Sequence, residues 1–397
     1  MSKKIIYIFP QLYTFGEIME QLFILRNIFH GFHLTLITYP LQKLRVNKAL
    51  FRIVTRGMNV IHSTDDNLIW FSTDVKSSLL YDSEYIYVNL NKTILLHEFL
   101  TRFQNYEPVF KYSLTKSDHK RGNQLRKRLG IPKDAPIVTV HMREAGYKNL
   151  HGRPEGPDGQ LRNVTPENYV PAIDYLLSKN FYVIRLGDKT MTRLNINKPN
   201  YIELPFHSEY CDFSDLYFVA VSLFFIGCSS GPTSIAEIFG VPQLTINAYA
   251  HFQVRAWKND ILIFKEYYSH HLGRSLTWEE ILSSPALFIK DVNHNLGFEI
   301  KENSPKDIFS ATKEMISRLD GTYFKENEMK ALIDHFKEIQ LKASTIQAEK
   351  KKEHSFLNTG LLNFVGQNSF PLSVEYLRAN PNFMGHDWAQ KLEFLHI

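Results

Sequence analysis

The sequence predicts an α/β fold built from two similar units. Short apolar runs typical of buried strands alternate with segments of helical periodicity, first over residues 4–39 and again over residues 137–246. A chain of 397 residues is long enough for two or three domains of about 150 residues each. We therefore expect two Rossmann-like domains that face a central cleft, with C-terminal helices packing back on them.

Composition restricts the class of protein. The 44% hydrophobic and 13% aromatic residues suffice for sizeable cores, which excludes global disorder. Two cysteines, Cys211 and Cys228, allow neither a disulfide framework nor a cysteine-rich metal site, so a reducing cytoplasmic setting is the default. The net charge of +5 is too small and too dispersed for nucleic acid. It fits anionic small molecules or an anionic membrane surface.

The N-terminus resembles the start of a signal peptide, because Lys3 and Lys4 precede the apolar run IIYIFP. That run is too short for such a peptide and is followed by Gln11 and Glu17, so we expect a buried first strand. No uncharged apolar run approaches the roughly 20 residues that span a bilayer. The expected location is the cytoplasm, with peripheral association at the inner face of the cytoplasmic membrane as a further option.

The N-terminal domain is expected to span residues 1–115. Its first strand covers residues 4–9, and the helical pattern that follows stops at Gly31. Gly16 lies where this strand meets its helix, a position that faces the crevice of doubly wound sheets, and is a candidate ligand contact. The other strands of a parallel sheet are predicted at residues 34–39, 59–63, 68–72 and 85–88.

The middle of the chain changes in composition. Residues 116–136 (KSDHKRGNQLRKRLGIPKDAP) are basic and polar, which favours a solvated helix and linker over a nucleic-acid or membrane patch. The expected organisation is a linker at 116–134, a second Rossmann-like domain at 135–322 and a helical extension at 323–397. Predicted strands lie at 137–141, 182–186 and 201–204, and predicted helices at 166–179 (with Thr165 as N-cap), 212–221, 304–317 and 323–352.

Residues 224–247 (FFIGCSSGPTSIAEIFGVPQLTIN) form a strand, turn, helix, strand pattern. Pro232 stands at the first helical position, Ser229 or Ser230 can cap the helix, and Gly240 suits a left-handed C-terminal position. Amides and the helix dipole converge on the turn, which favours a phosphate or diphosphate. The alternative is a tight connection of the kind that any α/β protein needs.

The strand at 137–140 leads into VTVHMREAGYKN, which places His141, Arg143 and Glu144 at its carboxyl edge. The Arg143 guanidinium can hold a phosphate through two hydrogen bonds, and His141 can donate beside it. Glu144 is either a catalytic carboxylate or the partner that fixes Arg143. The alternative is an exposed charged turn with an internal Arg–Glu pair.

The loop HGRPEGPDGQLRN is long and rich in functional groups, which predicts an active-site loop. Asp158 lies within it, and Arg162 and Asn163 end it. At the end of the next strand, Gly187 could admit a ligand close to the backbone, and Asp188 could meet a hydroxyl or cap the turn.

The segment GCSSGPTSIAEIFGVPQLTIN resembles the donor-binding segment of GT-B glycosyltransferases, where a small-residue turn, S-G-P and a short helix ending in G-V-P receive the nucleotide-sugar diphosphate. HMR resembles the H-x-R motif of fucosyltransferase-like enzymes, whose arginine holds the donor phosphate. HMREAGY, LRNVTPENYVPAIDYL, VIRLGD, DFSDLYFVA and FFIGCSSGPTSIAEIFG are together similar to bacterial glycosyltransferases of surface-polysaccharide (lipopolysaccharide) gene clusters. The similarity covers about residues 138–247, and elsewhere only the architecture is alike.

The resemblance implies that Arg143 contacts the donor diphosphate. It does not imply GDP-fucose, because Glu144 and Tyr147 stand where the fucosyltransferase pattern commonly has Gly and Asp. A second cation for the diphosphate is not obvious, and Lys148, Arg162 and Arg185 are candidates. The predicted donor-binding set is Arg143, Gly187, Asp188, Ser229, Ser230, Gly231, Thr233 and Ser234, with Gly16, Tyr147, Arg162, Asn163, Arg185 and Glu237 as a second rank.

The function expected from this resemblance is a glycosyltransferase that moves a sugar from a nucleotide-sugar donor to an oligosaccharide or lipid-linked glycan. The chain has no suitable D-x-D motif, since Asp65 and Asp66 are adjacent, so we expect neither a metal nor another cofactor. Candidates for the base or nucleophile are Glu144, Asp158 and His141, in that order. The alternatives are a GT-B-fold nucleotide-sugar epimerase or hydrolase, and a non-catalytic nucleotide-sugar-binding protein.

Overall fold

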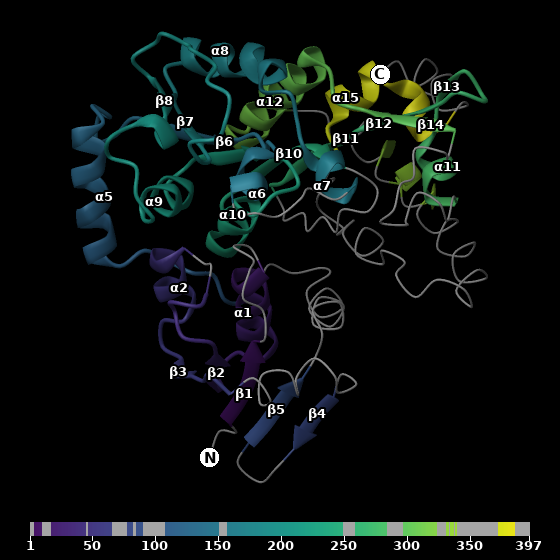
Figure 1. Ribbon diagram of the computed structural model, residues 1–397. Helices are drawn as coiled ribbons and strands as arrows, with labels where there is room; N and C mark the ends of the chain where they lie inside the picture. Colours follow the sequence, from purple (N-terminus) through teal and green to yellow (C-terminus); the bar gives the residue numbers. More distant parts are fainter. Residues whose placement is uncertain are drawn as a thin grey trace. The chain divides into compact units, whose positions relative to one another are not determined.

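The computed structural model divides the chain into two units, each with its own sheet (Figure 1). Unit 1 comprises Met1–Leu129, Glu209–Val221 and Gly231–Val241, and unit 2 comprises Gly130–Ser208, Ser222–Ser230 and Pro242–Ile397. The structure describes residues 4–9, 17–44, 47–65, 78–81, 85–89, 108–150, 157–248, 259–283, 297–323, 331–332, 334–336, 338–339 and 372–385. The α/β class is confirmed, while the contiguous domain boundaries and the shared cleft stay predictions.

The sheet of unit 1 has the order β3-β2-β1-β5-β4. Its strands are β1 (Lys4–Phe9), β2 (His33–Thr38), β3 (Asn59–His62), β4 (Ser78–Tyr81) and β5 (Tyr85–Asn89). The predicted strands that the structure describes pair in parallel, as expected, whereas β4, which was not predicted, runs antiparallel to β5. Residues 82–84 are too short a connection for a parallel crossover, which needs a dozen residues or more. The predicted strand at 68–72 and Gly16 lie outside the described residues.

The helices of unit 1 are α1 (Glu17–Ile28), α2 (Lys48–Val54), α5 (Lys116–Arg128), α9 (Ser214–Ala220) and α10 (Thr233–Phe239). The basic stretch is a regular helix, as expected, and a capping box between Thr115 and Asp118 starts it. Helix α5 packs closely on α9, because a Cβ at Gly122 would lie 1.8 Å from the Tyr217 ring. The expected linker therefore includes a helix that is packed into unit 1.

Unit 2 contains a six-stranded parallel sheet in the order β11-β10-β9-β6-β7-β8. The strands are β6 (Ile137–His141), β7 (Tyr182–Leu186), β8 (Tyr201–Glu203), β9 (Phe224–Gly227), β10 (Gln243–Ala248) and β11 (Ile261–Phe264). Numbered from β6, the order is the 3-2-1-4-5-6 arrangement of doubly wound sheets. In such sheets ligands bind where the strand order reverses, which here is between the carboxyl ends of β6 and β9.

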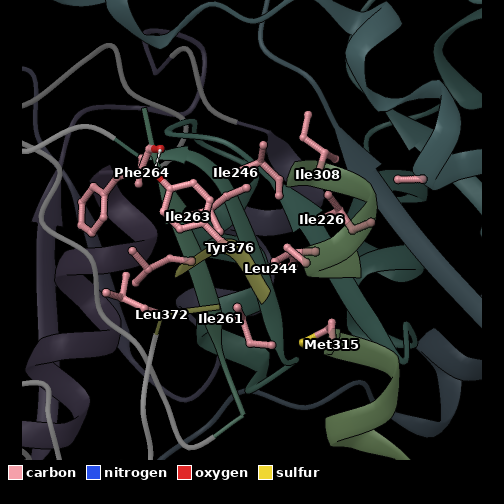
Figure 2. Packing of buried hydrophobic residues seen from close by; sticks show 14 of the residues in the cluster. Ile226, Leu244, Ile246, Ile261, Ile263, Phe264, Ile308, Met315, Leu372 and Tyr376 are labelled. Atoms are coloured by element: carbon pink, nitrogen blue, oxygen red, sulfur yellow. Dashed lines mark hydrogen bonds between the residues drawn. The ribbon is translucent and has the colours of Figure 1, made fainter. Parts of the chain in front are cut away.

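Helices α8 (Val170–Ser178) and α12 (Pro305–Leu319) lie side by side over this sheet (Figure 1). The 3-10 helix η1 (Pro166–Tyr169) precedes α8, and Thr165 holds the expected N-cap position. Its side chain bonds to Glu302 and does not cap the helix. Figure 2 shows Ile226, Leu244 and Ile246 of the strands packed with Ile308 and Met315 of α12.

The C-terminal segment at 372–385 packs back on unit 2, as expected. It holds α15 (Val374–Ala379) and η4 (Pro381–Met384), and Leu372 extends the sheet through a parallel bridge to Leu262. The buried Glu314 carboxylate accepts bonds from Ser373 Oγ (2.6 Å) and the Val374 amide (3.0 Å), and it pairs with Arg318. The hydrogen bonds that satisfy the buried Glu314 carboxylate therefore also attach the C-terminal segment to α12.

The remaining elements of unit 2 lie around the sheet. They are α6 (Gly146–Leu150), α7 (Pro157–Arg162), η2 (Leu204–Phe206), α11 (Trp278–Ser283) and an antiparallel sheet of β12 (Glu266–Ser269), β13 (Arg274–Ser275) and β14 (Phe298–Lys301). In the part of the chain that the structure describes, no helix combines the length and the apolar character of a membrane span.

Candidate functional site

Polar and charged residues follow the carboxyl ends of several unit 2 strands. Strand β6 ends at His141, and Arg143 lies two residues beyond it. Strand β9 ends just before Cys228, and β11 ends just before Lys265. Because the strands are parallel, these ends share one edge of the sheet, and the edge includes the point where the strand order reverses.

Arg143 is held by the segment that contains α7. Its Nη1 donates to the main-chain oxygen of Gly159 at 2.7 Å and to Oδ1 of Asn163. Both acceptors are neutral carbonyl oxygens. The main chain of Arg143 is fixed as well, since its N–H donates to Cys228 Sγ at 3.4 Å and its oxygen accepts from Val164 N at 3.0 Å. The guanidinium is thereby preorganised at the end of β6, as the sequence pattern predicted for its position.

His141 is buried beside this arginine, and its Nδ1 lies 2.9 Å from Ser230 Oγ. Burial, helped by the charges of Arg185 and Arg143, lowers the pKa of His141 to about 3. The imidazole is therefore neutral at physiological pH and is a poor proton acceptor. This geometry favours a role in binding and positioning over the catalytic role predicted from the sequence.

The turn after β9 differs from the prediction in its capping. Helix α10 has Pro232 at its N-cap and no side-chain cap, so the expectation that Ser229 or Ser230 caps it is wrong. Ser230 Oγ bonds to His141 instead. Ser229 is only 1% exposed, and its Oγ has no hydrogen-bond partner among the described residues. The predicted left-handed conformation of Gly240 is confirmed, with a φ of 68°.

Four of the predicted site residues fall in the other unit. Gly231, Thr233, Ser234 and Glu237 belong to the segment Gly231–Val241, which groups with unit 1, whereas Arg143 belongs to unit 2. Their part in the site stays a prediction.

Glu144 takes part in a network with Arg185. The Arg185 guanidinium is 1% exposed and pairs with Glu144 at 3.0 Å and with Glu203 at 2.7 Å. Glu144 also accepts hydrogen bonds from the Thr192 amide (3.1 Å) and hydroxyl (2.7 Å). The pair expected between Arg143 and Glu144 is thus replaced by one between Arg185 and Glu144. These contacts favour a structural role for Glu144. They also favour a structural role for Arg185 over the predicted contact with a diphosphate, because its guanidinium pairs with two carboxylates.

Gly187 and Asp188 shape their own loop. A Cβ at Gly187 would lie 1.7 Å from Met191 Sδ, so a side chain of the protein fills the space predicted for a ligand. Asp188 Oδ1 accepts bonds from the Thr190 amide (2.8 Å) and hydroxyl (2.5 Å). These contacts support the role of Asp188 in capping the turn over the alternative role of binding a ligand hydroxyl.

Other predicted residues lie on the two short helices near Arg143. Tyr147 is exposed on α6, and Arg162 ends α7. Asn163 directly contacts Arg143, which supports its place in the predicted set. Asp158 lies in α7 and Lys148 in α6, but their side chains are outside the described part of the structure.

Lys265 is a residue that the sequence reasoning missed. Its Nζ donates to the main-chain oxygen of Asn163 at 3.2 Å, and its side chain is buried. Asn163 therefore contacts both Lys265 and Arg143. Burial lowers the pKa of Lys265, and the negative charge of Glu302 opposes that shift. The signal in the sequence was a lysine directly after the apolar strand ILIF, at a parallel-strand end.

The low pKa of His141 predicts an acid-sensitive fold. Between pH 6.5 and pH 3 the unfolded chain binds a proton that the folded chain excludes, so the free energy of unfolding falls as pH falls. The variant His141→Asn keeps a polar partner for Ser230 but cannot bind this proton. Between pH 6.5 and pH 5 we expect its free energy of unfolding to decrease by about 1–2 kcal/mol less than that of the wild type. Urea unfolding across this range measures the effect. The control is His271→Asn, at an exposed position of unit 2; equal pH dependence of the two variants would contradict the prediction.

The fold and this edge define a doubly wound α/β protein with a cationic, hydrogen-bonding site at its strand reversal. No protein-family model and no curated protein matches the sequence. Among solved structures, a glycosyl transferase family 9 protein from Veillonella parvula is similar at 12% identity and a TM-score of 0.43, covering 80% of this chain and 97% of that one. TibC from enterotoxigenic E. coli, an iron-containing dodecameric glycosyltransferase, has 10% identity, a TM-score of 0.38 and coverages of 81% and 80%.

A third similar structure is the E. coli ADP-heptose lipopolysaccharide heptosyltransferase II, with 10% identity, a TM-score of 0.36 and coverages of 61% and 84%. Similarity at these levels is too weak to assign an activity. The case for a function therefore depends on the residues of the site.

Proposed function

We propose that the chain is a glycosyltransferase that binds the diphosphate of a nucleotide-sugar donor at the carboxyl edge of unit 2. The observation that carries this proposal is the preorganised Arg143 guanidinium at the end of β6, beside the strand reversal of a doubly wound sheet. His141 and Ser230, bonded to each other, link the end of β6 to the turn after β9. Arginine is well suited to phosphate oxygens, because its planar fork can donate two parallel hydrogen bonds.

The chemistry of sugar transfer fits such a site. Breaking the bond between the sugar and the diphosphate leaves negative charge on the leaving group. A guanidinium that is already in place stabilises this charge without reorganisation, and one preorganised donor of this kind is typically worth about 3–4 kcal/mol. Arg143 would hold and neutralise the leaving diphosphate in this way.

Doubly wound sheets also bind dinucleotides, and the sequence after β6 disfavours that alternative. A dinucleotide site needs G-x-G-x-x-G in the turn after the first strand, so that the backbone can approach the pyrophosphate. Here that turn reads HMREAGYKN, which has an arginine and one glycine. A side-chain cation thus stands where dinucleotide-binding proteins use bare backbone.

The catalytic base or nucleophile has to be a residue other than Arg143, and the contacts of the three candidates differ. His141 is neutral with a pKa of about 3, and Glu144 is engaged by Arg185 and Thr192. Of the three candidates, Asp158 of α7 then has the best claim, because α7 also supplies Gly159 to Arg143.

The rest of the proposed function is supported by the sequence resemblance. The acceptor is an oligosaccharide or lipid-linked glycan of bacterial surface polysaccharide, and the reaction takes place in the cytoplasm or at the inner face of its membrane without a metal.

A donor screen tests the proposal. Thermal unfolding is measured with UDP-, GDP-, ADP-, dTDP- and CMP-sugars, with Mg²⁺ and with EDTA. At about a hundred times its Kd the correct donor stabilises the protein by about 2.7 kcal/mol, which raises the Tm of a unit of this size by about 5–10 °C. We expect one diphosphate donor to do so equally in EDTA. A response to none of the donors, or to CMP-sugars alone, would contradict a diphosphate site. Product analysis with and without acceptor then separates transfer from epimerisation and hydrolysis.

A further inference from the structure

We infer that Lys265 is a second cationic ligand of the same diphosphate and reaches it from the end of β11. This inference rests on the proposed function, which supplies the anion. It adds a residue that the H-x-R resemblance does not indicate and that the sequence reasoning missed.

The position of Lys265 is set by the sheet. Its main-chain N–H donates to the Ala248 oxygen at 2.6 Å, which ties the end of β11 to the end of β10. Its Nζ donates to the main-chain oxygen of Asn163, while Oδ1 of the same asparagine accepts from Arg143. One residue thus offers two carbonyl oxygens to two cations that come from different strands. A diphosphate can bridge the same two cations, because it carries oxygens on two adjacent phosphates.

Lys265 is a buried ammonium that has no direct ion pair among the described residues. Its side chain is 4% exposed, and within the described ranges no carboxylate forms an ion pair with it. The charged or titratable groups that face it are Glu302 and Cys228. The Glu302 carboxylate accepts hydrogen bonds from the amide and hydroxyl of Thr165 at 2.8 and 3.0 Å and acts on Lys265 only through space. Burial raises the pKa of the Cys228 thiol, which keeps it neutral. Buried charges are normally paired, and exceptions concentrate at functional sites.

A second unsatisfied group lies at the end of β9, which β10 separates from β11 in the sheet. Ser229 follows Cys228, which interacts electrostatically with Lys265, and the Ser229 hydroxyl is buried with no described partner. Buried hydroxyls without partners are rare and call for an explanation. A bound diphosphate has oxygens on two phosphates and could offer one to this hydroxyl and another to the ammonium.

Binding and protonation of Lys265 are then coupled. Burial lowers the pKa of Lys265 in the free protein, and a bound diphosphate raises it, so at pH values between the two the protein takes up a proton when it binds. Affinity therefore decreases as pH rises through this interval. An arginine at position 265 stays protonated and removes the effect.

The experiment compares Lys265→Met and Lys265→Arg with the wild type, by calorimetric titration of whichever of UDP, GDP, ADP and dTDP gives the largest thermal shift. At pH 7 we expect Met to weaken binding at least tenfold and Arg to retain it. As pH rises towards 10.5, the ordinary pKa of lysine, we expect the affinity of the wild type to fall more than that of the Arg variant. The matched control is Lys133→Met, at an exposed lysine of unit 2.

A stability measurement separates a ligand from a structural residue. Removal of an unpaired buried ammonium should raise the Tm of the ligand-free protein in Lys265→Met, whereas loss of a structural contact would lower it. Wild-type affinity in the Met variant, or the same pH dependence in the Arg variant as in the wild type, would overturn the inference about Lys265. Either result would leave the proposed function intact. If the wild type itself binds none of the four nucleotides, the proposed function fails together with it.

Discussion

Arg143→Ala should lower the affinity for the donor nucleotide and the rate of transfer at least about a hundredfold, because one preorganised donor at a developing charge is worth that much. The described hydrogen bonds of the side chain, to Gly159 and Asn163, are made to neutral oxygens. We therefore expect the fold to survive. Calorimetric titration and single-turnover transfer measure the two losses, and thermal unfolding checks the fold.

Two further variants define the cause of that loss. Arg143→Lys keeps the charge and loses the planar fork, so it should recover only part of the affinity. Arg193→Ala is the matched control, because this exposed arginine of unit 2 stacks on Phe206 instead of entering the site. Wild-type turnover by the Ala variant of Arg143 would remove the basis of the proposed function.

Arg185→Met is expected to destabilise unit 2 by about 3–5 kcal/mol, the usual loss when one partner of a buried ion pair is removed. Arg185 stands between Glu144 and Glu203 and also donates to the Thr192 oxygen at 2.5 Å. Without it, two carboxylates remain in a largely buried position without their cation. Because a chain of two units need not unfold in one step, the measurement is hydrogen exchange of the β6 and β7 amides.

Glu144→Gln distinguishes the structural role of this network from catalysis. The amide keeps an oxygen for Thr192, but it places an NH2 group, which has no charge and cannot accept a hydrogen bond, against Arg185. We expect a smaller destabilisation of about 1–3 kcal/mol and an unchanged turnover per folded molecule at saturating substrate. If turnover disappears while stability is unaffected, Glu144 is the catalytic carboxylate that the sequence pattern predicted.

Several parts of the fold follow from local pattern. The strands Lys4–Phe9, Ile137–His141 and Tyr182–Leu186 lie where the apolar runs predict them, because a strand buried on both faces of a parallel sheet is apolar throughout. The left-handed conformation of Gly240 could also be predicted from the sequence, since few other residues adopt it at a helix end.

Other features depend on partners that are distant in sequence. The antiparallel β4 is set by the brevity of residues 82–84, and the capping of α10 by the bond between Ser230 and His141. Glu144 and Arg185 are 41 residues apart, and Lys265 lies 102 residues from Asn163. Periodicity and motif spacing contain no information about such pairs.

The sequence by itself determined the α/β class, the strands β6 to β10 of the second sheet and the presence of Arg143 at a strand end, because each depends on residues that are neighbours in the chain. Only the tertiary structure decided which side chains face that arginine. It assigned Glu144 to Arg185, made His141 a buried neutral group, and brought Lys265 to Asn163. The physical reason is that the parallel strands align their carboxyl ends at one edge, whatever their separation in sequence. The charge and burial of each group are therefore set by the sheet order.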